Sequence, residues 1–228
     1  SGAGSDSAGG GHGGGVSACP VTSESEQTVF FASGPLRLEG RLSLALGLDA
    51  VVVTHPHPLY GGDLDNPVVA VLADAYRRRG YTALRFNFRG VGASGGHYAD
   101  GRGERDDVRA AAEFLAGLGK AVTDLAGYSF GAWVNLHLNP PLATVRRQLL
   151  VAPPVGFLEF GAVVAPEDLI VVAGDRDPFA PLDSLRELLP RWHPAARLHV
   201  LPGADHFCWN ALDRLAALVD AALAEPPG

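Results

Sequence analysis

The segment VTDLAGYSFG, residues 122–131, holds a strand pattern directly followed by a turn pattern. Residues 122–127 are mostly apolar and predict a buried strand. Residues 127–131 form Gly-x-Ser-x-Gly, and a helix is predicted from about residue 130 to residue 138. This order places Ser129 on a sharp strand-to-helix turn, where small residues on either side avoid clashes with the neighbouring elements. The N–H groups that begin the helix point toward the serine and can stabilise negative charge there.

The segments on either side of this turn alternate between strand patterns and helix patterns. Two strands separated by Gly34-Pro35 predict an antiparallel pair, and most later strands are followed by a helix. The alternation indicates an α/β fold with a mostly parallel sheet covered by helices on both faces. The predicted strands are 27–33, 36–44, 50–54, 82–88, 122–127, 148–152, 169–173 and 197–201, and the predicted helices are 66–79, 104–118, 130–138, 182–192 and 207–223.

Composition narrows the class of protein. The chain has 228 residues, of which 47% are hydrophobic, enough for one domain with a sizeable core. Two cysteines cannot build a disulfide framework. A net charge of -7 disfavours a nucleic-acid partner. No apolar run is long enough to predict a membrane span.

The first residues differ in composition from the rest. Residues 1–18 are mostly Gly, Ser and Ala, so we expect a flexible tail there and a single domain over residues 19–228. The sequence contains no Met and does not begin with one, as a processed chain would. We expect a soluble protein, cytoplasmic by default, with an organellar location left open.

A serine hydroxyl is a poor nucleophile until a base takes its proton, and two later segments offer partners. His206 lies just after the last predicted strand, at the predicted start of the closing helix. Asp175 and Asp177 both follow the preceding strand, and only one of them can orient the histidine. Residue type and position leave the choice between the two aspartates open.

Three further segments carry a family resemblance. They are HPHPLYGG at residues 55–62, RGVGAS at residues 89–94 and GADHF at residues 203–207. Together with the serine turn and the chain order serine, aspartate, histidine, they make residues 27–224 similar to the α/β-hydrolase superfamily. The likeness is greatest to small members with little lid and a His-Pro-His-Pro loop, including dienelactone-hydrolase-like enzymes. The resemblance implies the α/β-hydrolase fold.

The same resemblance implies a serine hydrolase of the carboxylesterase or thioesterase type. Ser129 would be the nucleophile and His206 the base, while Asp177 matches the family's acid because a hydrophobic-Pro turn follows it. The implied reaction needs a small acyl substrate and water, and no cofactor. The competing hypothesis is a non-catalytic α/β-hydrolase-fold protein that serves for binding or as a scaffold.

The chain departs from the superfamily where Pro56 replaces the glycine of the oxyanion loop. Proline has no N–H, so the loop donor is expected to be the backbone N–H of His57, or less favourably Leu59, paired with that of Phe130. His55 is expected to support this turn. The possible pocket residues are His55, Leu59, Tyr60 and Tyr128.

The segment of residues 153–168, where the superfamily usually carries its lid, is too short for a helical cap domain. We therefore expect an open site with no large lid. The loop of residues 95–103, which contains Tyr98, is the candidate for a partial cover.

Two other motifs give weaker evidence for a binding site. Residues 90–95 match Gly-x-Gly-x-x-Gly, but the next helix begins too far along the chain for a dinucleotide site. His55 and His57 form an H-x-H pair without the nearby Asp and His of a binuclear metal site, so no metal is expected. Cys208 is expected to be an inert core residue.

Overall fold

The computed structural model describes residues 1–2 and 26–226. The predicted tail over residues 1–18 and its boundary with the domain at residue 19 fall almost entirely outside the described residues. The described elements run from a strand that begins at Gln27 to a closing helix that ends at Ala224.

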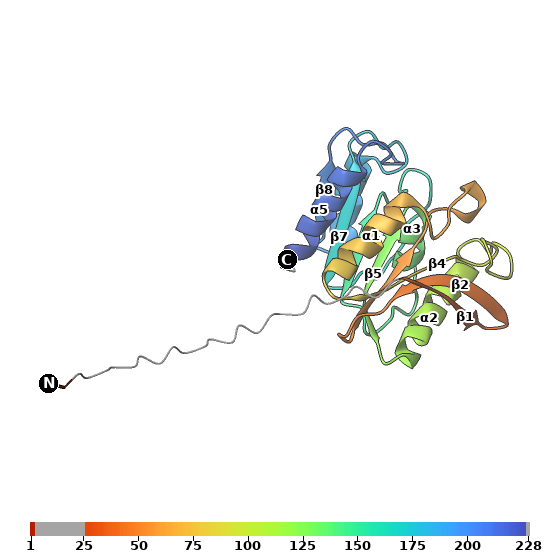
Figure 1. Cartoon of the computed structure of the whole chain (residues 1–228). Helices are drawn as coiled ribbons and strands as arrows, with labels where there is room; N and C mark the ends of the chain where they lie inside the picture. The colour runs from red at the N-terminus through yellow and green to blue at the C-terminus, as the bar shows by residue number, and fades with distance from the viewer. Residues whose placement is uncertain (3–25, 227–228) are drawn as a thin grey trace.

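One eight-stranded sheet runs through the molecule (Figure 1). The strand order is β1-β2-β4-β3-β5-β6-β7-β8, with β2 antiparallel to both β1 and β4, and every pairing from β4 to β8 parallel. The mostly parallel α/β sheet predicted from the sequence is confirmed. The strands are β1 (Gln27–Ser33), β2 (Leu36–Ser43), β3 (Asp49–Thr54), β4 (Thr82–Phe86), β5 (Ala121–Tyr128), β6 (Arg147–Val151), β7 (Asp168–Gly174) and β8 (Arg197–Leu201).

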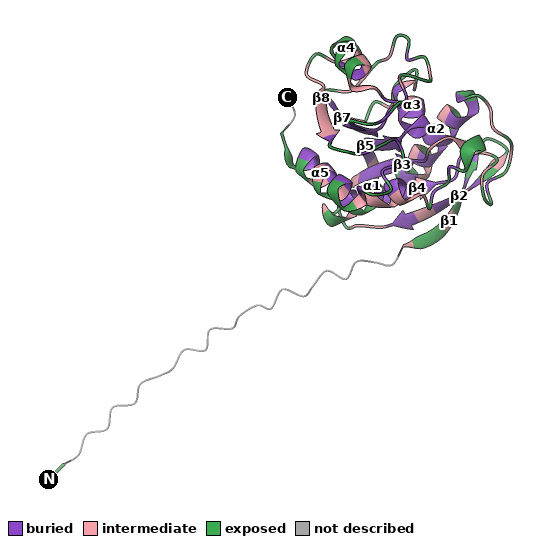
Figure 2. Ribbon diagram, turned by 90° about the horizontal axis from the view of Figure 1, so that it is seen from above, coloured by how far each residue is buried: buried purple, intermediate pink, exposed green. Residues whose placement is uncertain are grey.

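Helices cover both faces of the sheet. Figure 2 shows α1 and α5 on one face, and α2, α3 and α4 on the other. Apolar residues recur at helical spacing along α1 and α2, which explains why each buries one side against the strands. The helices are α1 (Pro67–Arg78), α2 (Arg102–Gly117), α3 (Phe130–Leu136), α4 (Leu182–Trp192) and α5 (Leu212–Ala224), and a short 3-10 turn, η1, spans Pro58–Tyr60.

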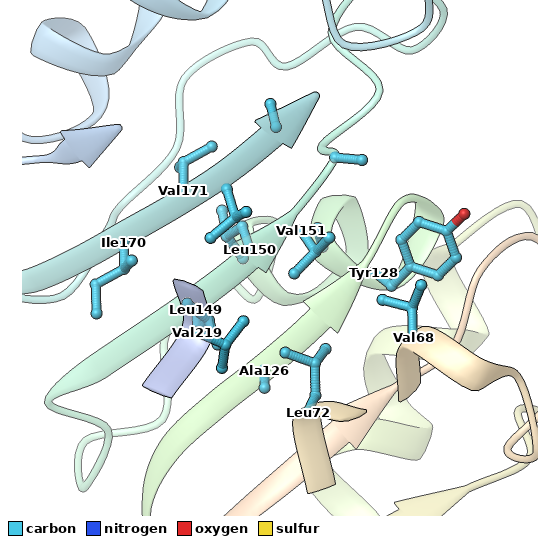
Figure 3. Close-up of a cluster of buried hydrophobic side chains, with 14 of the residues drawn as sticks. Val68, Leu72, Ala126, Tyr128, Leu149, Leu150, Val151, Ile170, Val171 and Val219 are labelled. Carbon is cyan, nitrogen blue, oxygen red and sulfur yellow. The ribbon is translucent and has the colours of Figure 1, made fainter. Parts of the chain in front are cut away.

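The central strands form the core on which the site is built. In β6 and β7 almost every side chain is buried, as expected for parallel strands covered on both faces (Figure 3). Side chains from α1 and α5 pack against them, and each fully buried aliphatic side chain contributes about 1.5–3 kcal/mol. The labelled members of this cluster are Val68, Leu72, Ala126, Tyr128, Leu149, Leu150, Val151, Ile170, Val171 and Val219.

The closing helix begins later than the sequence pattern predicts. It starts at Leu212 rather than residue 207. The Asp205 carboxylate accepts hydrogen bonds from the N–H groups of Phe207 and Cys208, both at 3.1 Å, and Cys208 adopts a left-handed φ of 55°. This side-chain turn competes with helical hydrogen bonding. His206 therefore lies in a loop ahead of the helix, and Cys208 is buried in a turn rather than at a helix start.

The connection from β6 to β7 carries no cap. Residues 152–167 form turns and irregular structure without a helix or strand. The expected absence of a large lid is thus seen in this part of the chain. Among the residues that the structure describes, no helix combines the length and apolar character needed to cross a bilayer.

Candidate active site

Ser129 sits between β5 and α3 in an unusual backbone conformation, with φ 53° and ψ −115°. Its N–H donates to the carbonyl of Val151 on β6 at 2.9 Å, which ties the turn to the neighbouring strand. A Cβ added at Gly127 would lie 2.7 Å from the nitrogen of Ala132, and one at Gly131 would lie 2.6 Å from the carbonyl oxygen of Thr54. The two glycines are therefore required by close backbone approach on both sides of the serine.

The structure brings three of the predicted residues into one hydrogen-bonded line. The Ser129 Oγ lies 2.9 Å from Nε2 of His206, and Nδ1 of His206 lies 2.8 Å from Oδ2 of Asp177. All three residues are buried. Both ring nitrogens of the histidine are engaged, which holds the imidazole in one orientation.

The two aspartates after β7 have different surroundings. Oδ1 of Asp177 accepts hydrogen bonds from the N–H groups of Phe179 at 2.8 Å and Ala180 at 3.0 Å, leaving Oδ2 for His206. Asp175 is exposed and accepts from the N–H of Gly203 at 2.6 Å. Asp177 is therefore the carboxylate beside the histidine, while Asp175 braces the loop after β8.

The side chain of Tyr128 supports the loop that carries His206. Its hydroxyl donates to the carbonyl of His206 at 2.8 Å, and burial raises the pKa of the phenol, which keeps it a donor. The ring is buried. Tyr128, predicted as a possible pocket residue, has a buried side chain whose hydroxyl holds the backbone of His206. Its sequence position beside Ser129 signals nearness to the site but not this role.

The side chain of His55 is also buried. It has no exposed surface, its Nε2 accepts from the N–H of Phe88 at 3.0 Å, and its Nδ1 lies 2.6 Å from the carbonyl of Pro56. Nε2 is an acceptor, so the proton is on Nδ1 and donates to that carbonyl. Burial lowers the pKa of His55 to about 4. The imidazole is therefore neutral and buried, with both ring nitrogens held by backbone hydrogen bonds.

The backbone of residues 56–62 folds back on itself. The carbonyl of His57 accepts from the N–H groups of Tyr60 at 3.1 Å and Gly62 at 3.0 Å. The N–H of Leu59 donates to Nδ1 of His57 at 3.2 Å, so this alternative loop donor is already used. Within residues 26–226 no acceptor is found for the N–H groups of His57 or Phe130.

The ring of His57 packs among aromatic side chains over the same loop. Its centroid lies 4.8 Å from that of Phe130 and 4.7 Å from that of Tyr60. Its Nε2 lies 3.3 Å from the hydroxyl of Tyr98. Burial lowers the pKa of His57. Tyr98, which the sequence associates only with a possible cover, contacts the loop from the segment before α2.

Exposed apolar side chains lie on the loop after β3 and beside His206. Leu59 and Tyr60 are exposed on the loop side. Phe157, Phe179 and Phe207 are exposed on the side of His206. The predicted pocket positions Leu59 and Tyr60 are therefore exposed on the loop after β3, and the rings of two phenylalanines that the sequence does not assign to the site, Phe179 and Phe207, contact His206.

The segment RGVGAS at residues 89–94 has a structural role. The guanidinium of Arg89 pairs with the buried Asp107 at 2.8 Å, and Ser94 Oγ donates to the carbonyl of Asn87 at 2.7 Å. The next helix begins only at Arg102, which does not suit a dinucleotide site. Within the described residues no three His, Cys, Asp or Glu side chains are grouped as metal ligands would be.

Comparison with known proteins places the chain in a family. No protein-family model matches it. An uncharacterised protein of Rickettsia prowazekii is 33% identical over 192 residues, 78% of this chain and 81% of that protein. An α/β serine hydrolase without a lid from Xanthomonas campestris is 30% identical with a TM-score of 0.79, covering 91% of this chain and 100% of the other.

An α/β serine hydrolase homologue from Coxiella burnetii is also 30% identical, with a TM-score of 0.77, covering 90% of this chain and 100% of that one. The two structural likenesses cover about nine tenths of the chain and support hydrolase activity in general. The chain belongs to the α/β-hydrolase superfamily.

Proposed function

We propose that this protein is a serine hydrolase that cleaves carboxylic ester or thioester bonds through an acyl-enzyme on Ser129. The observation that carries the proposal is the line from Ser129 Oγ to His206 Nε2 at 2.9 Å and from His206 Nδ1 to Asp177 Oδ2 at 2.8 Å. A nucleophile, its base and an orienting acid at hydrogen-bond distance are what acyl transfer requires.

In the first half-reaction, Ser129 Oγ attacks the carbonyl carbon of the substrate while His206 Nε2 takes the hydroxyl proton. A carbon–oxygen bond to the serine forms, and the carbonyl π electrons move to its oxygen. The tetrahedral intermediate then breaks its bond to the leaving oxygen or sulfur, which receives the proton from Nε2. Asp177 keeps the Nδ1 proton and stabilises the imidazolium that forms.

The oxygen that becomes negative is proposed to lie between the N–H groups of His57 and Phe130. Both are without an acceptor in the described part of the chain. Such donors stabilise the intermediate more than the substrate, and losing one costs roughly 3 kcal/mol in comparable sites. Phe130 is the first residue of α3, so the helix dipole adds to the stabilisation.

The second half-reaction repeats these roles with water. Water loses a proton to His206 Nε2 and attacks the acyl carbon, and the bond to Ser129 Oγ breaks as the serine regains a proton from the imidazole. The products are a carboxylic acid and the regenerated serine.

Fluorophosphonate labelling tests the proposal. We expect stoichiometric phosphonylation of Ser129 in the folded wild-type protein and none in Ser129→Ala, located by mass spectrometry of the labelled peptide. Ser94→Ala is a poor control because Ser94 Oγ bonds to the backbone. Denatured wild-type protein is the better control, since it keeps every serine but loses the arrangement around Ser129. Failure to label the folded protein would favour a binding or scaffold role.

The acyl and leaving groups are assigned by a substrate series. We expect 4-nitrophenyl esters of increasing chain length and acyl-CoA thioesters to be hydrolysed at rates that reveal the preferred acyl chain. Ser129→Ala and His206→Ala are each expected to lower kcat roughly a thousandfold or more. Removing both should cost little more than removing one, because the two residues act as a unit.

A further inference from the structure

Three phenylalanines form an apolar wall beside the histidine. The ring of Phe179 lies 4.8 Å from that of His206, the ring of Phe207 lies 5.7 Å from it, and Phe157 contacts Phe179 edge-on at 5.9 Å. Their exposed fractions are 37% for Phe179, 52% for Phe207 and 56% for Phe157. Exposed aromatic rings that gather in one place are typical of a binding surface.

The wall is built on the same backbone as the proposed catalytic groups. The N–H of Phe179 donates to Asp177, and its carbonyl accepts from the N–H of Gly156 at 2.8 Å, which joins the segment after β6 to the segment after β7. The N–H of Phe207 donates to Asp205. Hydrogen bonds therefore hold the backbone that carries these rings. Binding a ligand here costs little conformational entropy, because the loops are already ordered.

The chemistry of acyl transfer decides which part of a substrate meets this wall. The leaving oxygen must come within hydrogen-bond reach of His206 Nε2, because that atom protonates it. The carbonyl oxygen is held away from the histidine, toward the N–H groups of His57 and Phe130. The group attached to the leaving oxygen consequently extends past the histidine ring, where Phe179 and Phe207 lie.

We propose that Phe157, Phe179 and Phe207 form a leaving-group subsite that selects esters of apolar, preferably aromatic, alcohols. This inference rests on the proposed function. The three rings offer no hydrogen-bond donor or acceptor, so the subsite favours a hydrocarbon leaving group over a polar one such as the pantetheine arm of an acyl-CoA. Tyr60 and Tyr98, whose rings contact that of His57, carry hydroxyl groups and provide a different environment.

The test compares two acetate esters, 2-phenylethyl acetate and 2-methoxyethyl acetate, which share an acyl group and release alkoxides of similar basicity. For the wild-type protein we expect kcat/KM to favour the phenylethyl ester by tenfold or more. Phe179→Ala should reduce this ratio by roughly tenfold, the effect of losing one aromatic contact and its buried area. Phe179→Leu should retain part of the preference.

Two controls separate a subsite from a general loss of structure. Phe30 has the same 37% exposure as Phe179 but lies on β1, at the far edge of the sheet, so Phe30→Ala should leave the ratio unchanged. Decay of the acetyl-enzyme formed from 4-nitrophenyl acetate takes place after the leaving group has gone, so Phe179→Ala should change the ratio for the two esters far more than it changes this decay rate. Phe207→Ala provides a second variant on a different loop.

The outcomes distinguish this inference from the proposed function. Hydrolysis of both esters at similar kcat/KM, or a preference that survives both Phe179→Ala and Phe207→Ala, would overturn the subsite while leaving the serine hydrolase intact. If Phe179→Ala lowers the preference for the phenylethyl ester and the acetyl-enzyme decay rate by the same factor, the substitution acts generally on His206. That result would also overturn the subsite. No hydrolysis of these esters or of 4-nitrophenyl acetate would overturn both.

Discussion

At the scale of single residues, Gly62 governs the loop that carries His57. A Cβ at this position would lie 2.2 Å from the carbonyl oxygen of Pro56, so any other residue must push the loop out of place. We expect Gly62→Ala to lower kcat by about a hundredfold through loss of one oxyanion donor. The control is Gly117→Ala in α2, where nothing lies within 4 Å. Steady-state kinetics on one ester checks the pair, and equal rates in the two variants would contradict the prediction.

His55 links the loop to stability at acidic pH. Its pKa is lowered to about 4 in the folded protein, against about 6.5 in the unfolded chain. Between these values the unfolded chain binds the proton and the folded protein does not, so His55 lowers stability as the pH falls through that window. The full effect is about 3 kcal/mol below pH 4.

Urea unfolding at several pH values measures this linkage. We expect the free energy of unfolding of wild-type protein to fall more steeply between pH 6.5 and 4 than that of His55→Asn, which has no titrating ring. Taking the difference between the two proteins removes the contribution of the carboxylates they share. Parallel pH profiles would show that folding does not lower the pKa of His55.

At the scale of elements, the turn between β8 and α5 holds His206 in position. Asp205 accepts from the N–H groups of Phe207 and Cys208, and this turn replaces the helical start predicted from the apolar spacing. We expect Asp205→Ala to cost about 1 kcal/mol of stability and to lower kcat about tenfold. Asp205→Asn keeps the acceptor oxygen and should retain most of both properties.

The measurement pairs thermal unfolding with kcat for each variant at position 205. A structural role alone would lower the midpoint of unfolding without changing the activity of the folded fraction. Loss of kcat in Asp205→Asn equal to that in Asp205→Ala would point to the carboxylate charge instead of the turn.

At the scale of the whole molecule, ion pairs join the strands at the end of the sheet opposite the site. Asp168, buried at the start of β7, pairs with Arg147 of β6 at 2.5 Å and with Arg197 of β8. We expect Asp168→Asn to destabilise the protein by about 3 kcal/mol, because it leaves two largely buried guanidinium groups without their shared partner. Unfolding in urea gives the size of the loss.

The same variant tests whether the two ends of the sheet act independently. Asp168 and Asp177 lie at opposite ends of the same stretch of chain that includes β7, and their hydrogen-bond partners are separate. We therefore expect kcat and KM of folded Asp168→Asn to match the wild type well below its unfolding midpoint. Changed kinetics would indicate that the ion pairs set the position of the loop after β7.

Much of the architecture is encoded in local patterns. Buried strands such as β6 and β7 are visible as short apolar runs, and α1 and α2 as 3.6-residue periodicity, because burial on one or two faces selects these spacings directly. The start of α5 is the main exception. Residues 207–211 continue the apolar pattern, but the Asp205 side chain captures the first of their N–H groups and delays the helix.

The sequence by itself determined the α/β fold, the turn at Ser129 and the identity of the nearby histidine loop, because each depends on residues close together in the chain. The residues alone left Asp175 and Asp177 open, the resemblance pointed to Asp177, and the tertiary structure placed Asp177 beside His206. Only the tertiary structure decided that Tyr128 is a buried support of the histidine loop and that three phenylalanines from three separate loops gather beside the histidine. These depend on contacts between segments that follow different strands, and the distances between such segments are set by the packed sheet. Local spacing carries no information about them.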